Sequence, residues 1–276
     1  MKLINTYKLI KKSIYYIKLI KSIKLHLSKI LLFIGFFIIL RVLLHYFVKS
    51  RKEGMNEKRT AIIVEPREHK ALSFVLNNFC KNLDDNWDIV IVHGTKNEFF
   101  VKNIVNNDVK HNNHKIELVN LGVENLTIEE YNTLLTTPAF YDHIKTETFL
   151  IFQTDSMICE DYKDNINEFL NYDYVGAPNK EWVGNGGLSL RKKSKMLDII
   201  NKFQRKDNQY EDQYFTEKEH NLNIPDITTA NKFSNEGIYS DESFGVHKPW
   251  WYLNDEEINK KEKKCKGLKQ LIKLNK

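Results

Sequence analysis

The feature that most constrains the fold is an alternation of apolar runs with amphipathic stretches between residues 60 and 155. The apolar runs are rich in β-branched residues, as in strands buried on both faces, and the stretches between them have helical spacing. The predicted strands are TAIIVEP (60–66), WDIVIVHG (87–94), KIELVNLG (115–122) and FLIFQTD (149–155), and the predicted helices are 69–83, 97–105 and 127–144. This βαβαβαβ succession predicts an α/β fold with a mixed, mostly parallel sheet flanked by helices.

Three polar residues fall at the predicted carboxyl ends of these strands, namely Glu65, His93 and Asp155. Open sheets of this kind bind ligands in the crevice beyond the carboxyl ends of their strands. Taken alone, Asp155 has two interpretations, a turn cap that bonds to nearby backbone and a ligand for a metal or a sugar. Its place at the end of the fourth strand favours the ligand.

The charge of the chain is unevenly distributed. Residues 1–52 hold ten Lys, two Arg and no acidic residue, so the net charge of +6 divides into +12 for this segment and −6 for residues 53–276. A nucleic-acid-binding surface needs basic residues clustered on the folded part, interleaved with stacking aromatics. The composition therefore gives no reason to expect a nucleic-acid partner.

Residues 30–48, ILLFIGFFIILRVLLHYFV, predict a transmembrane helix. Nineteen helical residues span about 28 Å, close to the ~30 Å hydrocarbon core. Fifteen of them are Leu, Ile, Phe or Val, which together outweigh the cost of about 2.5–3.5 kcal/mol for Arg41. We therefore expect a single-pass protein attached to the membrane through residues 1–48. Basic residues flank both sides of the span, so its orientation stays open.

The sequence also predicts how the rest of the chain is divided. The segment before the span mixes Lys with Ile, Leu and Tyr, as in a basic helix on an anionic membrane surface or a solvated tail. The sequon NLT at Asn125 would suit a lumenal domain. The predicted parts are a basic amphipathic segment (1–29), the span (30–48), a linker (49–59), a folded domain (60–253) and a Lys-rich surface helix or frayed tail (254–276). Three widely spaced cysteines, Cys80, Cys159 and Cys265, show no metal-type pairing, so we expect free thiols.

The C-terminal half carries three short motifs with possible chemistry. In VGNGGLSLR (183–191), the glycines around Asn185 are typical of a β-hairpin turn or of a backbone that lies close to a ligand. In YEDQYF (210–215), Glu211 and Asp212 open a helix, where acids often only complement the helix dipole; one of them could instead be a general base. His247 in FGVHKPW is either structural or a metal ligand, since a His near a carboxylate often binds a divalent ion.

Taken in order, these motifs resemble an uncharacterised family of glycosyltransferase-like domains found in large DNA viruses and some bacteria. The resemblance covers about residues 60–253 and rests on IVEPREH, IVHGTKNEFF, NLGVENLTIEEYNTLL, FLIFQTDSMI, YDYVGAP, VGNGGLSLRKKSKML, EDQYF and FGVHKPW. That family is similar to the GT-A class of nucleotide-sugar glycosyltransferases, which have a Rossmann-like sandwich. The class typically carries an Asp-x-Asp motif after the fourth strand, a Gly-rich loop, a downstream acidic pair and a C-terminal His on the metal.

The resemblance implies a role for each matching residue. Asp155 matches an acid of the Asp-x-Asp motif and, with His247, would hold a divalent metal such as Mn²⁺ or Mg²⁺. Asp212 or Glu211 would be the catalytic base. The residues implied in donor binding are Glu65, Arg67, His93, Asp155, Asn185, Gly186 and Gly187. The sequence TDS supplies one carboxylate where the motif has two, which puts metal dependence in question.

The resemblance thus implies a hexosyltransferase that uses a nucleotide-sugar donor and the hydroxyl of a glycan or protein acceptor. Two alternatives stay open. The first is a catalytically inactive carbohydrate- or nucleotide-binding domain of the same fold, which has lost the second acid. The second is a membrane scaffold whose activity lies in the basic N-terminal segment.

Overall fold

The computed structural model describes residues 36–43, 57–110 and 113–276, and the chain divides into two compact units, Met1–Asn56 and Glu57–Lys276. In the first unit, residues 36–43 are helical with exposed side chains. Among all the described residues, no helix combines the length and the apolar character needed to cross a membrane. The predicted segment 1–29 and most of the predicted span 30–48 and linker 49–59 lie outside the described residues, so they stay predictions.

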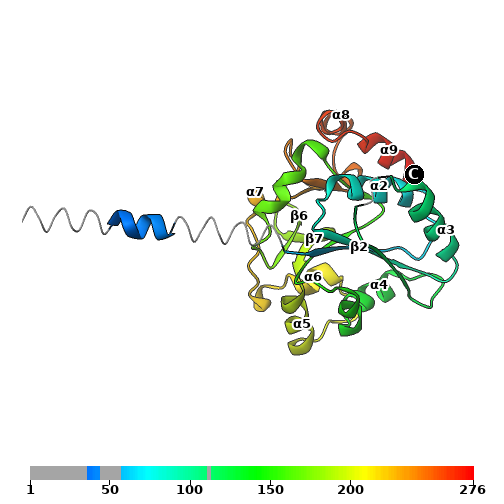
Figure 1. The fold of residues 1–276 in the computed structure, drawn as a ribbon, viewed down its shortest axis with the longest axis horizontal. Coiled ribbons are helices and arrows are strands. Elements are labelled where there is room, and N and C mark those ends of the chain that lie inside the picture. The colour runs from blue at the N-terminus through cyan, green and yellow to red at the C-terminus, as the bar shows by residue number, and fades with distance from the viewer. Residues whose placement is uncertain (1–35, 44–56, 111–112) are drawn as a thin grey trace, which may run out of the picture. The chain divides into compact units, whose positions relative to one another are not determined.

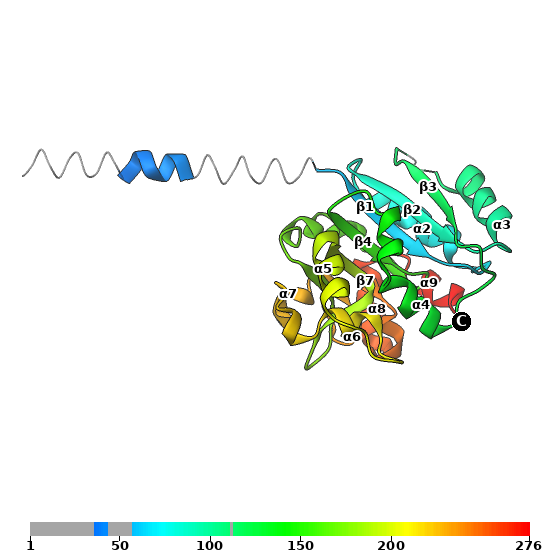
Figure 2. The ribbon, with the colours of Figure 1, turned by 90° about the horizontal axis from the view of Figure 1, so that it is seen from below.

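The second unit is built on a six-stranded sheet of strand order β3-β2-β1-β4-β7-β6. β1 pairs in parallel with β2 and β4, β2 pairs in parallel with β3, and β7 is antiparallel to β4 and β6. Figure 2 shows β1, β2 and β4 side by side. The strands are β1 Arg59–Val64, β2 Trp87–His93, β3 Ile116–Asn120, β4 Thr148–Phe152, β6 Tyr174–Pro178 and β7 Val183–Lys192. The predicted mixed, mostly parallel sheet is confirmed.

Helices cover both faces of the sheet (Figure 1). Alternate residues of β1 belong to opposite cores. Ile63 lies in the core that includes residues of α2, α8 and α9, and Ile62 lies in the core that includes residues of α4, α5 and α6. The α-helices are α2 Leu72–Asn82, α3 Glu98–Asn103, α4 Ile128–Leu135, α5 Lys193–Lys202, α6 Glu211–Phe215, α7 Ile227–Ala230, α8 Asp255–Lys264 and α9 Leu268–Leu274. Shorter turns are the π-helix Ile104–Asp108 and the 3₁₀ helices Pro138–His143, Glu160–Glu168, Lys218–His220 and Pro249–Trp251. Thr127 and Glu130 form a capping box at the start of α4, inside the helix predicted over 127–144.

A small second sheet joins distant parts of the chain beside the large one. It has the order β5-β9-β8, with β5 Ser156–Ile158, β8 Ser234–Asn235 and β9 Gly245–His247. β5 follows β4 after a three-residue turn and pairs antiparallel with β9, so that Ser156 lies opposite His247. This pairing brings the C-terminal His to the residue that follows Asp155.

The Lys-rich residues 254–276 belong to the same compact unit as the sheet. They form α8 and α9, whose apolar residues Ile258, Leu268 and Leu271 are buried in the core. The side-chain amide of Asn275 donates to the carbonyl of Thr154 at 3.0 Å. The end of the chain therefore supports the turn that carries Asp155.

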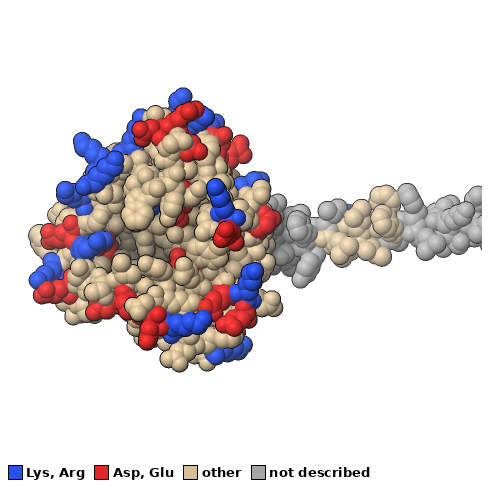
Figure 3. Space-filling view, turned by 180° about the vertical axis from the view of Figure 1, so that it is seen from behind, with Lys and Arg blue, Asp and Glu red and all other residues tan. Residues whose placement is uncertain are grey.

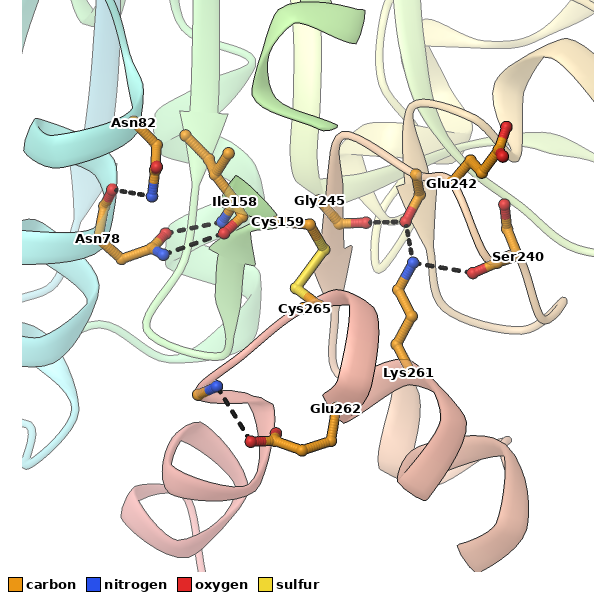
Figure 4. Close-up of a disulfide and its surroundings, with 12 residues drawn as sticks. Asn78, Asn82, Ile158, Cys159, Ser240, Glu242, Gly245, Lys261, Glu262 and Cys265 are labelled. Atoms are coloured by element: carbon orange, nitrogen blue, oxygen red, sulfur yellow. Dashed lines mark hydrogen bonds between the residues drawn. A yellow bond between two sulfur atoms is a disulfide. The ribbon is translucent and has the colours of Figure 1, made fainter. Parts of the chain in front are cut away.

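The prediction of three free thiols is wrong for two of them. Cys159, which follows β5, and Cys265, which follows α8, form a disulfide, as Figure 4 shows; Cys80 is free and buried. The two partners are 106 residues apart in sequence and meet because α9, which begins shortly after Cys265, packs against β5. Spacing along the chain carries no trace of such a contact, which explains the error.

Candidate active site

A cavity of about 420 Å³ lies at the carboxyl ends of β1 and β4, where the strand pattern predicted a ligand site. Its walls come from the segments that follow β1 and β4, from α4, β7 and α6, and from β9. The predicted site residues that line it are Glu65, Arg67, Asp155, Asn185, Gly186, Gly187, Glu211, Asp212 and His247. His93 does not line it. That side chain is buried at the end of β2, with Nδ1 2.8 Å from the carbonyl oxygen of Gly94.

Asp155 and His247 form a close pair in the wall of the cavity. The distance from Asp155 Oδ1 to His247 Nε2 is 3.3 Å, and both atoms are buried without a hydrogen-bond partner among the described residues. Two neighbouring ligands of an octahedral cation, each about 2.0–2.1 Å from the metal, lie about 3 Å apart. The pair therefore has the chemistry and the spacing of two ligands of one divalent cation.

Glu236 lies next to the His247 ring, and Gly187 leaves room for it. Glu236 Oε1 lies 3.4 Å from His247 Nδ1, on the side of the ring away from Asp155. In the metal-free protein burial by itself would lower the pKa of His247, but the Asp155 and Glu236 carboxylates outweigh burial and raise the pKa to about 10. A metal bound at Nε2 would therefore displace a proton, and a carboxylate at the Glu236 position would orient the ring for it. A Cβ at Gly187 would overlap the His247 ring, so only glycine fits beside it. Sequence reasoning did not find Glu236, because nothing in its spacing marks it.

Met157, two residues after Asp155, is 0% exposed and packs in the apolar core. An acid there would be buried away from the cavity. His247, on the paired strand, approaches Asp155 from the other side.

The surroundings of Asp155 keep its carboxylate ionised. Burial by itself would raise its pKa, but the neighbouring His247 and Lys248 outweigh burial and lower the pKa to about 2. Lys248 Nζ lies 3.8 Å from Asp155 Oδ2, and the Lys248 backbone N–H donates to the Asp155 carbonyl. Sequence reasoning did not single out Lys248, although it follows His247 directly.

The adjacent acids Glu211 and Asp212 have different surroundings. Glu211 accepts two hydrogen bonds from Arg191, at 2.7 and 2.9 Å, and Arg191 is 0% exposed. The Arg191 guanidinium also lies over the ring of Tyr174 and donates to Ser189 Oγ. Burial would lower the pKa of Arg191, but the Glu211 carboxylate raises it well above its usual range. Glu211 is thus engaged in a buried bidentate ion pair.

Among the described residues, no Lys, Arg or His forms an ion pair with Asp212. Its Oδ2 accepts from the backbone N–H of Gly186 at 3.0 Å, and its Oδ1 accepts from that of Gln213 at 2.7 Å. Burial and the Glu211 carboxylate raise the pKa of Asp212 to about 6, although these two hydrogen bonds act in the opposite direction. A carboxylate with this pKa is suited to accept a proton near neutral pH.

The glycine-rich stretch lies within β7 and not at a turn. β6 and β7 form an antiparallel pair, and the connection between them is residues 179–182. A Cβ at Gly186 would overlap the Glu211 carboxylate, just as one at Gly187 would overlap His247. The glycines are therefore explained by the close approach of charged side chains. Asn185 accepts from the backbone N–H of Gly187 at 3.0 Å and lines the cavity.

Glu65 and Arg67 form a rigid unit at the end of β1. Arg67 donates from Nε and Nη2 to the two carboxylate oxygens of Glu65, each at 2.8 Å. Asn97 is fully buried and donates to the carbonyls of both residues, while it accepts from the backbone N–H of Gly94. The side of the cavity next to β1 is therefore fixed by hydrogen bonds.

On the face drawn in Figure 3, Lys and Arg side chains of the described residues are interspersed with Asp and Glu around the outline of the folded unit. Neither sign gathers into one broad patch on this face. The local charges inside the cavity are thus a better guide to its ligand than the charge of the surface.

Comparison with known proteins finds one matching family model and several similar solved structures. Residues 115–247 match the model of a family described as "Protein of unknown function (DUF5672)", in agreement with the resemblance to an uncharacterised family. No curated protein matches the chain.

Among solved structures, the chain is similar to the mannosyltransferase PcManGT from Pyrobaculum calidifontis, in complex with GDP-Man and Mn²⁺, at 15% identity and a TM-score of 0.46, over 67% of this chain and 62% of that one. It is also similar to the glycosyltransferase GlyE of Streptococcus pneumoniae TIGR4, at 14% identity and a TM-score of 0.48, over 80% of this chain and 63% of that one. For HddC from Yersinia pseudotuberculosis, the identity is 12% and the TM-score 0.41, over 61% of this chain and 88% of that one. This chain spans less than two thirds of the length of the two transferases. With TM-scores below 0.5, these likenesses carry no argument about function, which rests on the residues of the site.

Proposed function

We propose that this chain is a GT-A-like glycosyltransferase that moves a sugar, expected to be a hexose, from a nucleotide-sugar donor to a hydroxyl of a glycan or protein acceptor. One observation carries the proposal. A single cavity contains the buried Asp155–His247 ion pair and, apart from it, the Asp212 carboxylate, whose pKa is about 6. Together they supply a place for a diphosphate and a base for a hydroxyl. The order of the sequence motifs supports the same conclusion.

The donor diphosphate would lie beside Asp155 and His247. These two residues would hold Mn²⁺ or Mg²⁺, which commonly take few protein ligands when substrate phosphates complete the coordination. A bound divalent ion would supply positive charge against the diphosphate as it leaves. Lys248, next to the same pair, adds a positive charge of the protein itself. Glu65 and Arg67 would bind the nucleoside at the end of β1.

Asp212 would accept the proton of the acceptor hydroxyl. The hydroxyl oxygen then forms a bond to the anomeric carbon, and the bond from that carbon to the diphosphate oxygen breaks, with the electron pair leaving on the nucleoside diphosphate. Attack by a base-activated hydroxyl on the face opposite the leaving group implies inversion at the anomeric carbon. Glu211, held by Arg191, would act on this step only through the pKa of Asp212.

The test is release of nucleoside diphosphate by the full chain from a panel of nucleotide sugars, with and without Mn²⁺. We expect turnover with at least one donor, and its loss in Asp155→Asn and His247→Ala. Asp198→Asn, on exposed α5, and His143→Ala, outside the cavity, are the matched controls. Donor binding without turnover by the wild-type chain would instead favour the non-catalytic binding domain. Unchanged turnover and metal binding in both cavity variants would refute the assignment of these two residues.

We also propose that residues 1–48 attach the chain to a membrane, with the folded unit in an oxidising compartment. The apolar run 30–48 supports attachment, and the Cys159–Cys265 disulfide supports the compartment, because disulfides rarely persist in the cytosol. The sequon residue Asn125 is exposed but lines the donor cavity, where a glycan would obstruct the nucleotide sugar, so the test does not depend on the sequon. Translation of the full chain with microsomes should give a folded unit that added protease reaches only after detergent is added. A folded unit that protease reaches without detergent would lie on the cytosolic side.

A further inference from the structure

A second cavity, here called the outer groove, joins the first one at the candidate base. It has a volume of about 630 Å³ and is lined by the turn between β6 and β7, by α6, by residues 236–237 and by Tyr252. Asn185, Tyr210 and Asp212 line both cavities. A molecule bound in the outer groove would therefore reach the donor cavity beside the carboxylate of Asp212.

The outer groove presents aromatic rings to solvent. Tyr210 is 52% exposed and Tyr252 is 61% exposed, values that leave large parts of both rings free for a ligand. The Trp182 ring is fixed by a 2.8 Å hydrogen bond from Nε1 to Thr216 Oγ1. A pyranose ring has an apolar face of C–H groups and a rim of hydroxyls, so it packs on such amphipathic rings while its edge stays hydrogen-bonded.

The polar residues of the outer groove suit hydroxyl groups and disfavour anions. Side-chain amides of Asn179, Asn185 and Gln213 line the groove and offer N–H donors to hydroxyl groups, while the Oδ1 atoms of Asn179 and Asn185 accept from the backbone. The charged residues of the lining are Lys180, Glu181, Asp212 and Glu236. Glu236 faces His247, so Glu181 and Asp212 against Lys180 leave a small excess of negative charge. An acidic sugar or a phosphorylated ligand would meet repulsion there, and a lipid chain would bury these charges against hydrocarbon.

We propose that the outer groove is the acceptor site and that it takes a glycan whose terminal sugar is uncharged or an amino sugar, packed on Tyr252 and Tyr210 with one hydroxyl directed to Asp212. This inference rests on the proposed function and narrows its acceptor from glycan or protein to a glycan of stated charge. Trp182 and the amide side chains bind the sugars that follow the terminal one.

The inference is tested on the full chain with four probes: chitotetraose, mannotetraose, a sialylated oligosaccharide and an unglycosylated Ser/Thr peptide. We expect a neutral oligosaccharide to bind and to accelerate release of nucleoside diphosphate beyond the slow hydrolysis of the donor. Tyr252→Ala should raise the half-saturating concentration of that oligosaccharide about 3- to 10-fold, the range expected for loss of one aromatic contact. The half-saturating donor concentration should not change, because Tyr252 lies outside the donor cavity.

Phe99→Ala is the matched control, because Phe99 is an equally truncatable aromatic, 84% exposed on α3, and lines neither cavity. Preference for the sialylated probe, use of the peptide, or an unchanged response in Tyr252→Ala would each overturn the inference and leave the glycosyltransferase proposal intact. If no donor is turned over, the proposed function fails. Binding of a neutral oligosaccharide that is weakened by Tyr252→Ala would then still support a carbohydrate site in the outer groove.

Discussion

Two parts of one cavity hold an aspartate each, and they differ in the sign of the charges around it. Asp155 lies beside His247 and Lys248, which lower its pKa to about 2, whereas Asp212 lies beside Glu211, which together with burial raises its pKa to about 6. Both carboxylates are partly buried in the lining of the same cavity, so burial alone does not explain the difference between their pKa values. Neighbouring charge therefore assigns the roles: one acid stays an anion that binds cations, and the other can carry a proton.

The substitution Asp212→Asn is expected to have the largest effect on the difference between the two aspartates. Loss of a positioned base lowers turnover by about 10²- to 10⁴-fold, while donor binding should persist, because the Asp155–His247 pair is untouched. In the wild-type chain, kcat/KM should rise with pH through about 6, as Asp212 loses its proton. The measurement is a pH profile of both proteins. A wild-type profile that is flat between pH 5 and 7 would exclude Asp212 as the base.

The next largest effect is expected from the ion pair behind Asp212. Glu211→Gln leaves the fully buried Arg191 without its partner, which should lower the free energy of unfolding by about 3–5 kcal/mol. Chemical denaturation measures the loss. The double variant Arg191→Met with Glu211→Met is the control, because an apolar pair of similar volume needs no counter-charge. A loss below about 1 kcal/mol in Glu211→Gln would show that the pair does not hold this wall.

Removing each aspartate's charge should shift stability in opposite directions at pH 8. The pKa of Asp212 is raised above its unfolded value, so its contribution is present at low pH and is lost as the pH rises through about 6. The pKa of Asp155 is lowered, so its contribution is present above pH 4 and is lost as the pH falls towards 2. Asp212→Asn should therefore stabilise the metal-free protein, by at most about 3 kcal/mol, and Asp155→Asn should destabilise it by about 2 kcal/mol.

Thermal unfolding in the presence of a chelator, at pH 5 and pH 8, measures both shifts. The gain in Asp212→Asn should shrink at pH 5, where the wild-type carboxyl is already protonated for most of the time. Equal signs for the two variants at pH 8 would mean that the neighbouring charges do not separate these carboxyls.

The sequence predicts the first half of the fold better than the site. β1, β2 and β4 follow from β-branched runs, and α4 follows from its capping box, because each of these signals is local. Glu211 and Asp212, in contrast, are adjacent and chemically alike in sequence. Only the packing of β7 against α6 brings Arg191 to one of them and leaves the other at the cavity.

Other parts of the site depend on pairing between distant segments. The approach of His247 to Asp155 requires the pairing of β5 with β9, and Glu236 reaches His247 through a loop without a motif. The Cys159–Cys265 contact likewise depends on the packing of α9 against β5. Asp155 and His247 could be named from their resemblance to a motif, but the residues that tune them could not, since no local pattern encodes a tertiary neighbour.

The smallest expected effect concerns Glu236, which sharpens the description of the Asp155 side. The Glu236 carboxylate lies 3.4 Å from His247 Nδ1, while Nε2 faces Asp155. When Nε2 binds a metal, Glu236 would favour the proton on Nδ1. Glu236→Gln keeps the shape but removes the charge, so the affinity for Mn²⁺ should fall about 10-fold, the lower end of the range for such partners. Glu242→Gln, which is exposed, is the control. Titration calorimetry with Mn²⁺ alone decides the matter: an unchanged affinity would mean that Asp155 and the donor phosphates, and not an oriented His247, determine whether metal binds.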